Sequence, residues 1–332
     1  MKVMITGITG FAGPHLANLL LKEGHEIDGL IRGSNGRECD LLDVMSPENL
    51  ERIRFHYGDL KDYQSLSKIF TKNKFDGVFH LAAQSHPPTS FIDPVGTMES
   101  NVMGSANLID VIQRHQPECI LQFTSTSEVY GDQGKDVGVL TEDLALKPSN
   151  PYGTSKAAID LYVQERCKNR FLRGFITRAF SHTGTRRGKN FSISCDAYNL
   201  ALMKKDPTKS RELPVGNLKT KRIVMDVKDC VGAYYGIMLK FDETVNGQAY
   251  NVCGAKEDLR EMEFFTDTLI EISGLEGVVK KIDPRFFRPI DIQIQVGDTV
   301  KLKKLTGWTP TSPLNETLKD LFNYWYRKIQ QV

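Results

Sequence analysis

The sequence has no run of apolar residues long enough to span a bilayer, and its start, MKVMITGITG, lacks the charged-then-apolar layout of a secretion signal. It also has no polybasic run, and 43 basic against 41 acidic residues leave a formal net charge of only +2. Because the basic and acidic residues nearly cancel, the net charge gives no electrostatic basis for binding nucleic acid. These absences predict a cytoplasmic protein that binds neither a membrane nor nucleic acid.

Paired cysteines and metal-ligand spacings are also missing. Six cysteines lie far apart with no C-x-x-C pair, which is typical of free thiols in the cytosol rather than of a disulfide framework (Cys39, Cys119, Cys167, Cys195, Cys230 and Cys253). His86 and His182 have no partner at ligand spacing, so no metal site is predicted.

The amino-terminal half alternates short apolar runs with stretches of helical periodicity. Strands are predicted over 2–7, 26–32, 52–60, 77–83 and 119–127, and helices over 14–25 and 105–117, with Gly24 capping the first helix. This alternation predicts an α/β fold, a Rossmann-type doubly wound parallel sheet with a smaller carboxy-terminal substrate lobe. After about residue 180 the sequence reads as less regular and richer in turn residues.

A glycine-rich turn follows the first predicted strand, at Gly7, Gly10 and Gly13. Glycine permits a tight turn and the close approach of a pyrophosphate, which the positive end of the next helix attracts. The spacing G-x-x-G-x-x-G differs from the G-x-G-x-x-G of most dehydrogenases, but its place between a strand and a helix indicates a dinucleotide site.

The end of the second predicted strand indicates which dinucleotide is preferred. An acidic residue there would bind the ribose 2′-hydroxyl of NAD, but this chain has Arg32, followed by Gly33, Ser34, Asn35 and Arg37. Guanidinium groups suit a 2′-phosphate, so the sequence favours NADP, with NAD as the alternative.

A Thr-Ser-Glu triplet and a Y-x-x-x-K pair complete the pattern, at Thr126, Ser127 and Glu128, and at Tyr152 and Lys156. With the glycine turn, they make the chain resemble the extended short-chain dehydrogenase/reductase family. The resemblance implies that Tyr152 takes a proton from a sugar hydroxyl while hydride leaves for the nicotinamide, and that Thr126 holds the hydroxyl. A free phenol has a pKa near ~10, so Lys156 is expected to lower it and to hold the nicotinamide ribose.

Within that family the chain is most similar to enzymes that act on GDP-sugars. Segments in the same order resemble GDP-mannose 4,6-dehydratase: HYGDL (56–60), LAAQSH (81–86), STSEVYG (125–131), RRGKNF (186–191), GNLKTKR (216–222), FRP (287–289) and VGD (296–298). Others resemble GDP-4-keto-6-deoxymannose reductase: RAFSHTG (178–184), DVKD (226–229) and KLTGWTP (304–310). Where the dehydratases tend to have Asn-His, this chain has Ser181 and His182, which leaves the sugar open between a hexose and a longer manno-configured sugar.

The resemblance implies two domains and a set of binding residues. An NADP-binding Rossmann domain is expected over 1–180, with elements returning from 220–255, and a mainly nucleotide-sugar-binding lobe over 181–332. The expected cofactor residues are Gly7, Thr9, Gly10, Phe11, Ala12, Gly13, Arg32, Asp59, Leu60, Leu81, Ala82, Ala83, Asn101, Tyr152 and Lys156. The expected substrate residues are Ser85, Arg187, Asn190, Arg222 and Arg288, with the arginines binding the diphosphate. The family also implies a homodimer or homotetramer.

Glu128 determines which reaction is expected. Once C4 of the sugar is a ketone, a carboxylate can remove the acidified C5 proton and the C6 hydroxyl can leave, so Glu128 favours a GDP-sugar 4,6-dehydratase. A GDP-4-keto-6-deoxy-sugar reductase or a GDP-sugar C4 dehydrogenase is the alternative. The STSEVYG segment also resembles UDP-glucuronate decarboxylases. An inactive NADP-binding module is the remaining alternative, which the intact Thr126, Tyr152 and Lys156 disfavour.

Overall fold

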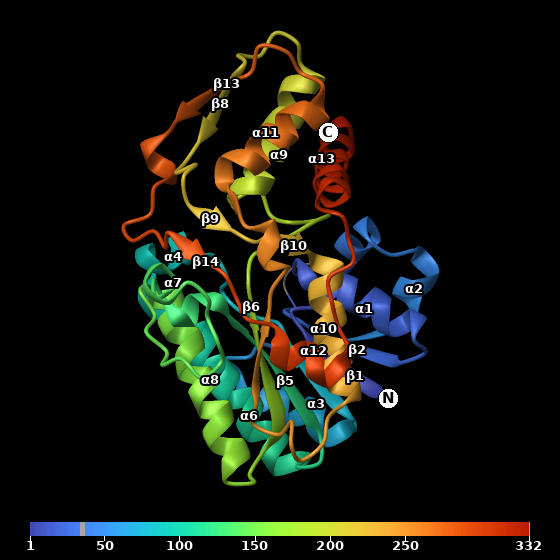
Figure 1. Ribbon diagram of the computed structural model, residues 1–332. Helices are drawn as coiled ribbons and strands as arrows, with labels where there is room; N and C mark the ends of the chain where they lie inside the picture. The colour runs from blue at the N-terminus through green and yellow to red at the C-terminus, as the bar shows by residue number, and fades with distance from the viewer. Residues whose placement is uncertain (34–36, 332) are drawn as a thin grey trace.

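A seven-stranded parallel sheet forms the centre of the protein in the computed structural model, which describes residues 1–33 and 37–331 (Figure 1). The strand order is β11 (Ala249–Val252), β6 (Arg173–Ala179), β5 (Ile120–Thr126), β4 (Gly77–His80), β1 (Lys2–Thr6), β2 (Glu26–Ile31) and β3 (Ile53–Tyr57). The order reverses between β1 and β4, the position at which doubly wound sheets bind ligands. The predicted Rossmann-type fold is confirmed.

Two layers of helices cover the sheet. On one face lie α1 (Ala12–Lys22), α10 (Val227–Leu239) and α12 (Val300–Thr306), whose buried apolar residues include Leu16, Leu20 and Val231. On the other face lie α3 (Tyr63–Lys72), α6 (Gly104–His115) and α8 (Pro151–Lys168), with Leu108 and Ile159 fully buried. Burial on both faces explains why the strands read as continuous apolar runs.

The five predicted strands and both predicted helices are present, with shifted ends. β4 ends at His80 rather than at residue 83, so Leu81, Ala82 and Ala83 leave the sheet. α1 begins at Ala12 and its C-cap is Glu23, followed by Gly24 with φ +79°. Gly24 thus takes the left-handed conformation that ends many helices.

The prediction of a less regular chain after about residue 180 is wrong. Three helices, α9 (Ser192–Lys205), α11 (Met262–Ser273) and α13 (Leu314–Gln330), pack together with β8 (Glu212–Val215), which pairs with β13 (Val279–Ile282). In α9 the buried side chains include the polar Ser194 and Asp196, which interrupt the apolar periodicity that would mark a helix. These elements form the smaller lobe at the top of Figure 1.

The chain passes between the two lobes more than once. α10 and β11 return to the sheet layers, and α12, which lies later in the chain, packs against α10 and β11. The shorter elements are η1 (Arg37–Asp43), α2 (Pro47–Glu51), α4 (Pro87–Ile92), α5 (Pro94–Met98), η2 (Glu99–Met103), η3 (Ser127–Tyr130), α7 (Gly134–Val137), β7 (His182–Thr183), β9 (Lys221–Arg222), β10 (Met225–Asp226), η4 (Lys256–Asp258), β12 (Arg260–Glu261), η5 (Pro284–Phe286) and β14 (Ile294–Gln295).

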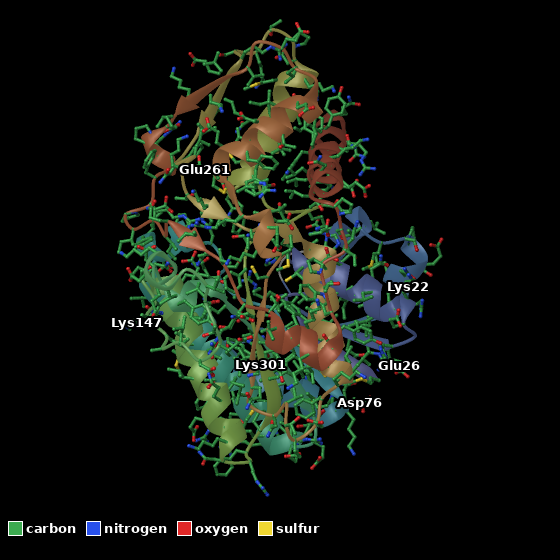
Figure 2. All side chains as sticks on the ribbon, in the orientation of Figure 1. Lys22, Glu26, Asp76, Lys147, Glu261 and Lys301 are labelled. Atoms are coloured by element: carbon green, nitrogen blue, oxygen red, sulfur yellow. The ribbon has the colours of Figure 1, made fainter. Side chains whose placement is uncertain are left out.

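Side chains fill the layers between sheet and helices, and charged residues such as Lys22, Glu26 and Lys147 lie at the outer surface (Figure 2). Over the described ranges, no helix is both long and apolar enough to cross a membrane. Cys119, Cys167, Cys230 and Cys253 are free and buried, and Cys195 is free and half-buried. The side chain of Cys39 lies outside the described part of the structure.

Candidate active site

A cavity of about 620 Å³ lies at the carboxyl ends of β1, β4 and β5 and extends into the smaller lobe. Its wall includes most residues expected from the sequence: Gly7, Gly10, Phe11, Ala12, Gly13, Leu81, Ala82, Ala83, Ser85, Thr126, Ser127, Glu128, Tyr152, Lys156, Arg187, Asn190, Arg222 and Arg288. The fold therefore brings residues from across the whole chain to one site.

The glycine turn forms a backbone cradle at one end of this cavity. Gly7 has φ +73°, and a Cβ there would lie 2.7 Å from the backbone nitrogen of Ala82. A Cβ on Gly13 would lie 2.4 Å from the carbonyl oxygen of Gly7, so neither position admits a side chain. The turn leads into the amino-terminal end of α1, where free backbone N–H groups attract phosphate. The geometry fits the pyrophosphate of a dinucleotide.

Arg32 and Asp59 lie apart from the main cavity, in the wall of a second one of about 540 Å³ that also involves Gly33, Tyr57, Gly58, Asp62 and Ser65. Arg32 is exposed at the end of β2. The position beside the β2 terminus matches the place where a Rossmann fold binds the adenosine ribose. Ser34 and Asn35 lie outside the described residues, as does the side chain of Arg37.

Thr9, Leu60 and Asn101 are not in the wall of either cavity. The carbonyl oxygen of Thr9 accepts a hydrogen bond from Arg186 (3.2 Å), and that of Leu60 accepts one from Asn107 (2.9 Å). Asn101 is buried, and its amide donates to the Gln84 carbonyl and to Ser155 Oγ, both at 2.9 Å. Asn101 therefore joins the segment after β4 to α8, a structural role that the sequence did not reveal.

The proposed acid–base groups lie where β5 ends and α8 begins. Thr126 is the last residue of β5, and its Oγ1 accepts a hydrogen bond from the backbone nitrogen of Glu128 (3.3 Å). Tyr152 and Lys156 lie one turn apart on α8 and are both buried. Lys156 Nζ donates to the carbonyl oxygen of Thr124 at 2.8 Å.

The structure does not show the expected lowering of the Tyr152 pKa by Lys156. Burial raises the pKa of Tyr152 to about 12, although a hydrogen bond with Thr126 works in the opposite direction. Burial also lowers the pKa of Lys156 to about 7, because its ammonium group is removed from water. For both groups, burial has the largest effect on the pKa. The sequence reveals only that the two residues are one helical turn apart, and not that they are buried.

Glu128 lies in η3 with its carboxylate facing two partners. Its Oε2 accepts a hydrogen bond from Asn150 Nδ2 at 2.7 Å, and its Oε1 lies 3.6 Å from Arg288 Nη1. Asn150 Oδ1 in turn accepts from the backbone nitrogen of Gly153 and caps α8. Asn150 was missed as a site residue, although its place before Pro151 is a helix-start signal.

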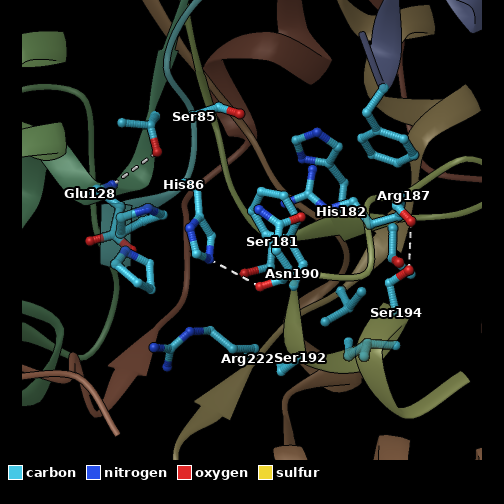
Figure 3. Close-up of a pocket in the computed structure, with 18 of the residues that line it drawn as sticks. Ser85, His86, Glu128, Ser181, His182, Arg187, Asn190, Ser192, Ser194 and Arg222 are labelled. Carbon is cyan, nitrogen blue, oxygen red and sulfur yellow. Dashed lines mark hydrogen bonds between the residues drawn. The ribbon is translucent and has the colours of Figure 1, made fainter. Parts of the chain in front are cut away.

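The arginines of the smaller lobe enter the cavity from two loops and a strand. Arg187 lies with its guanidinium 4.8 Å from the ring centre of Phe11 and 3.5 Å from that of Phe191. Arg222, on β9, is buried and donates to the carbonyl oxygen of Ile292 at 2.7 Å. His86 Nε2 donates to the carbonyl oxygen of Asn190 at 3.0 Å across the site (Figure 3). Phe191, the last residue of the RRGKNF segment, thus orients Arg187 by stacking.

No group of three or more His, Cys, Asp or Glu side chains within the described ranges could hold a metal ion.

Comparison with known proteins shows the family to which the chain belongs. The family described as GDP-mannose 4,6 dehydratase matches residues 4–321. A GDP-mannose 4,6-dehydratase of Vibrio cholerae is 29% identical over 348 residues, covering 96% of this chain and 92% of that protein. One of Sordaria araneosa is 31% identical over 342 residues, but this chain covers only 60% of its length. A GDP-6-deoxy-D-mannose reductase of Pseudomonas aeruginosa is 26% identical over 331 residues, covering 99% of both proteins.

Solved structures show the same fold. The protein RMD of Pseudomonas aeruginosa, complexed with NADPH, has a TM-score of 0.80 at 24% identity and covers 98% of this chain and 99% of its own. DesIV, a dTDP-glucose 4,6-dehydratase of Streptomyces venezuelae with NAD bound, has a TM-score of 0.84 at 24% identity, covering 100% of this chain and 98% of its own. The match over nearly the whole chain shows that this protein is an enzyme of the GDP-mannose 4,6-dehydratase family, which includes nucleotide-sugar dehydratases and reductases.

Proposed function

We propose that the protein is a GDP-sugar 4,6-dehydratase that converts GDP-mannose or GDP-manno-heptose to the 4-keto-6-deoxy sugar with NADP as a retained cofactor. The observation that carries the proposal is the carboxylate of Glu128, which lines the same cavity as Tyr152. The two groups are close enough that the Glu128 charge, after burial, helps to raise the pKa of the Tyr152 phenol. A simple alcohol oxidation needs one proton acceptor, whereas an elimination needs a second acid–base group.

In the proposed reaction, Tyr152 accepts the proton of the C4 hydroxyl and Thr126 positions that hydroxyl. When bound, the oxidised nicotinamide supplies a hydride acceptor for C4, a positive charge that favours phenolate, and the hydride that returns to C6. Glu128 removes the C5 proton, made acidic by the neighbouring C4 ketone. Glu128 or a group it positions then protonates the departing C6 hydroxyl, and water is lost. Tyr152 then donates to C5 the proton that it accepted from the C4 hydroxyl, so that Tyr152 and Glu128 both regain their starting protonation states.

The surroundings of Glu128 and Lys156 support these roles. Asn150 holds one carboxylate oxygen of Glu128 and leaves the other toward Arg288 and the cavity. Lys156, whose ammonium is held at the Thr124 carbonyl, is placed to bind the nicotinamide ribose. Arg187, Arg222 and Arg288 supply the positive charge that a diphosphate requires.

A reductase is the second candidate, because the Pseudomonas aeruginosa GDP-6-deoxy-D-mannose reductase matches this chain over 99% of both lengths. Incubation with GDP-mannose and catalytic NADP distinguishes the two. A dehydratase yields a product lighter by one water with no net change in reduced cofactor. A reductase leaves GDP-mannose unchanged and consumes NADPH only when a 4-keto sugar is added.

Arg32 is proposed to select NADP by binding its 2′-phosphate. Because a charge-assisted hydrogen bond contributes about 1.5–3 kcal/mol, Arg32→Ala should weaken NADP binding by about 10- to 100-fold and leave NAD binding nearly unchanged. Titration of both cofactors into the variant measures this directly. Arg54→Ala, which removes the same charge from neighbouring β3, is the control and should alter neither affinity. Equal losses of NADP and NAD affinity in Arg32→Ala would contradict the proposal.

A homodimer is proposed from apolar residues exposed on neighbouring helices. Ile92 (86% exposed), Val95 (68%) and Leu161 (55%) lie on α4, α5 and α8, which pack against one another. Exposed apolar residues on helices that pack together support an interface, here with a second copy of the chain. The wild type should sediment as a dimer or tetramer at micromolar concentration, and Ile92→Glu with Leu161→Glu should shift it to a monomer. A monomeric wild type would rule out this proposal.

A further inference from the structure

The end of the cavity that lies in the smaller lobe is lined by both apolar and polar side chains. Its wall there is formed by α9, by β8 with the loop that follows it, and by α11, and includes Ile193, Val215, Leu218 and Met262. In the same wall lies Asp196 of α9, which is only 6% exposed. A buried carboxylate costs free energy unless donors surround it, so its presence there needs an explanation.

The protein satisfies this carboxylate only in part. Thr266 Oγ1, on α11, donates to Asp196 Oδ2 at 2.7 Å. Among the residues that the structure describes, no other donor to the Asp196 carboxylate is found. Burial raises the pKa of Asp196 to about 7, which agrees with a carboxylate that lacks donors. An ionised carboxylate can accept about four hydrogen bonds, so most of its capacity is available to a ligand.

The position of Asp196 relative to the arginines indicates which part of the ligand it meets. Arg222 lies on β9, two residues after Thr220. The carbonyl oxygen of Thr220 accepts a hydrogen bond (2.9 Å) from the backbone nitrogen of Met262, the first residue of α11. The helix that carries Thr266 therefore starts beside the strand that carries Arg222. A nucleotide sugar with its sugar at Tyr152 and its diphosphate at the arginines would therefore have its base at the end of the cavity beside Asp196.

The bases differ in the pattern of hydrogen-bond donors and acceptors on their edges, so a carboxylate can distinguish them. Guanine presents two adjacent donors, N1–H and the 2-amino group. Uracil and thymine present one N–H between two carbonyl oxygens, which a carboxylate repels, and adenine and cytosine place an acceptor beside a donor. We infer that Asp196 accepts hydrogen bonds from N1–H and the 2-amino group of guanine, and so selects GDP-linked sugars. The inference rests on the proposed function and assigns its base selectivity to one residue.

Matched changes in residue and ligand test this inference by nucleotide binding alone. Wild type should bind GDP at least ~100-fold more tightly than UDP, and IDP, which lacks the 2-amino group, about 10-fold more weakly than GDP. Asp196→Asn keeps an acceptor for Thr266 but replaces one acceptor face with an N–H donor. It should lose about 10- to 100-fold in GDP affinity and gain affinity for xanthosine diphosphate, whose 2-carbonyl accepts from the new amide.

Asp291→Asn is the matched control, because Asp291 also lines the cavity and its carboxylate accepts a hydrogen bond from Asn217 (3.0 Å). It removes the same charge and should change GDP and UDP affinities by the same factor. Thermal unfolding of Asp196→Asn monitors its fold, and the comparison of GDP with IDP needs no variant.

The outcomes separate this inference from the proposed function. The role of Asp196 is overturned if Asp196→Asn binds GDP as tightly as the wild type does. It is also overturned if the wild type binds IDP as tightly as GDP. In both cases the dehydratase proposal stands. Wild type that prefers UDP overturns both the role of Asp196 and the GDP-sugar assignment. A switch toward xanthosine diphosphate without turnover of any GDP-sugar supports the role of Asp196 and counts against the dehydratase.

Discussion

Tyr152→Phe should lower turnover of the GDP-sugar by about 10²- to 10⁴-fold, the range that a positioned acid–base group contributes, while leaving substrate affinity almost unchanged. The change removes the hydroxyl that is proposed to accept the C4 proton, and the buried phenyl ring still fills the same space. The measurement is a single-turnover assay of reduced cofactor, in which this variant should form none from the unmodified sugar.

Tyr234→Phe is the control for this change. Tyr234 lines the same cavity and is 1% exposed, but its hydroxyl contacts Cys230 Sγ at 3.2 Å rather than Thr126. It should retain most of the wild-type activity. Tyr152→Phe with a tenth or more of wild-type turnover would show that another group accepts the C4 proton.

Glu128→Gln should stop the reaction between its two halves. The first hydride transfer needs Tyr152 and not Glu128, so the variant should accumulate reduced cofactor and a 4-keto sugar that still carries its C6 hydroxyl. Overall turnover should fall by about 10²- to 10⁴-fold, because the C5 proton has no acceptor. Rapid quench with mass spectrometry of the sugar, together with cofactor absorbance, measures both species.

The opposite behaviour of the two variants is what separates oxidation from elimination. Tyr152→Phe forms no reduced cofactor, whereas Glu128→Gln forms it and retains it. The carboxamide at position 128 still accepts from Asn150, so the local fold is kept. Glu128→Gln that releases the dehydrated product at the wild-type rate would reduce Glu128 to a positioning role.

The sequence predicts the parts of this site that depend on local patterns. The glycine turn, the spacing of Tyr152 and Lys156 on one helix, and the strands of the sheet follow from residue types and periodicity within short segments. The contact of Glu128 with Arg288 joins positions far apart in the chain, so no local pattern could reveal it. The same holds for Asp196 and Thr266, which two separate helices bring together.

Burial accounts for the other differences between prediction and structure. The spacing of Tyr152 and Lys156 predicts a lowered pKa for the phenol. Burial in the folded protein instead raises the pKa of Tyr152, and no local sequence pattern reveals that burial. In α9, buried polar residues hid the helical period. Polar groups buried inside a lobe at a cost in stability, such as Asp196, are themselves a sign of function.

Turnover of GDP-mannose by the wild-type enzyme in deuterated water tests the central claim, that Glu128 makes this enzyme a dehydratase. The proton taken from C5 exchanges with solvent before it is replaced, so the 4-keto-6-deoxy product should carry deuterium at C5. The amount of reduced cofactor should show no net change, because the hydride removed from C4 returns to C6. Steady production of NADPH from GDP-mannose, or NADPH consumption that requires an added 4-keto sugar, would contradict the claim and make the enzyme a dehydrogenase or a reductase.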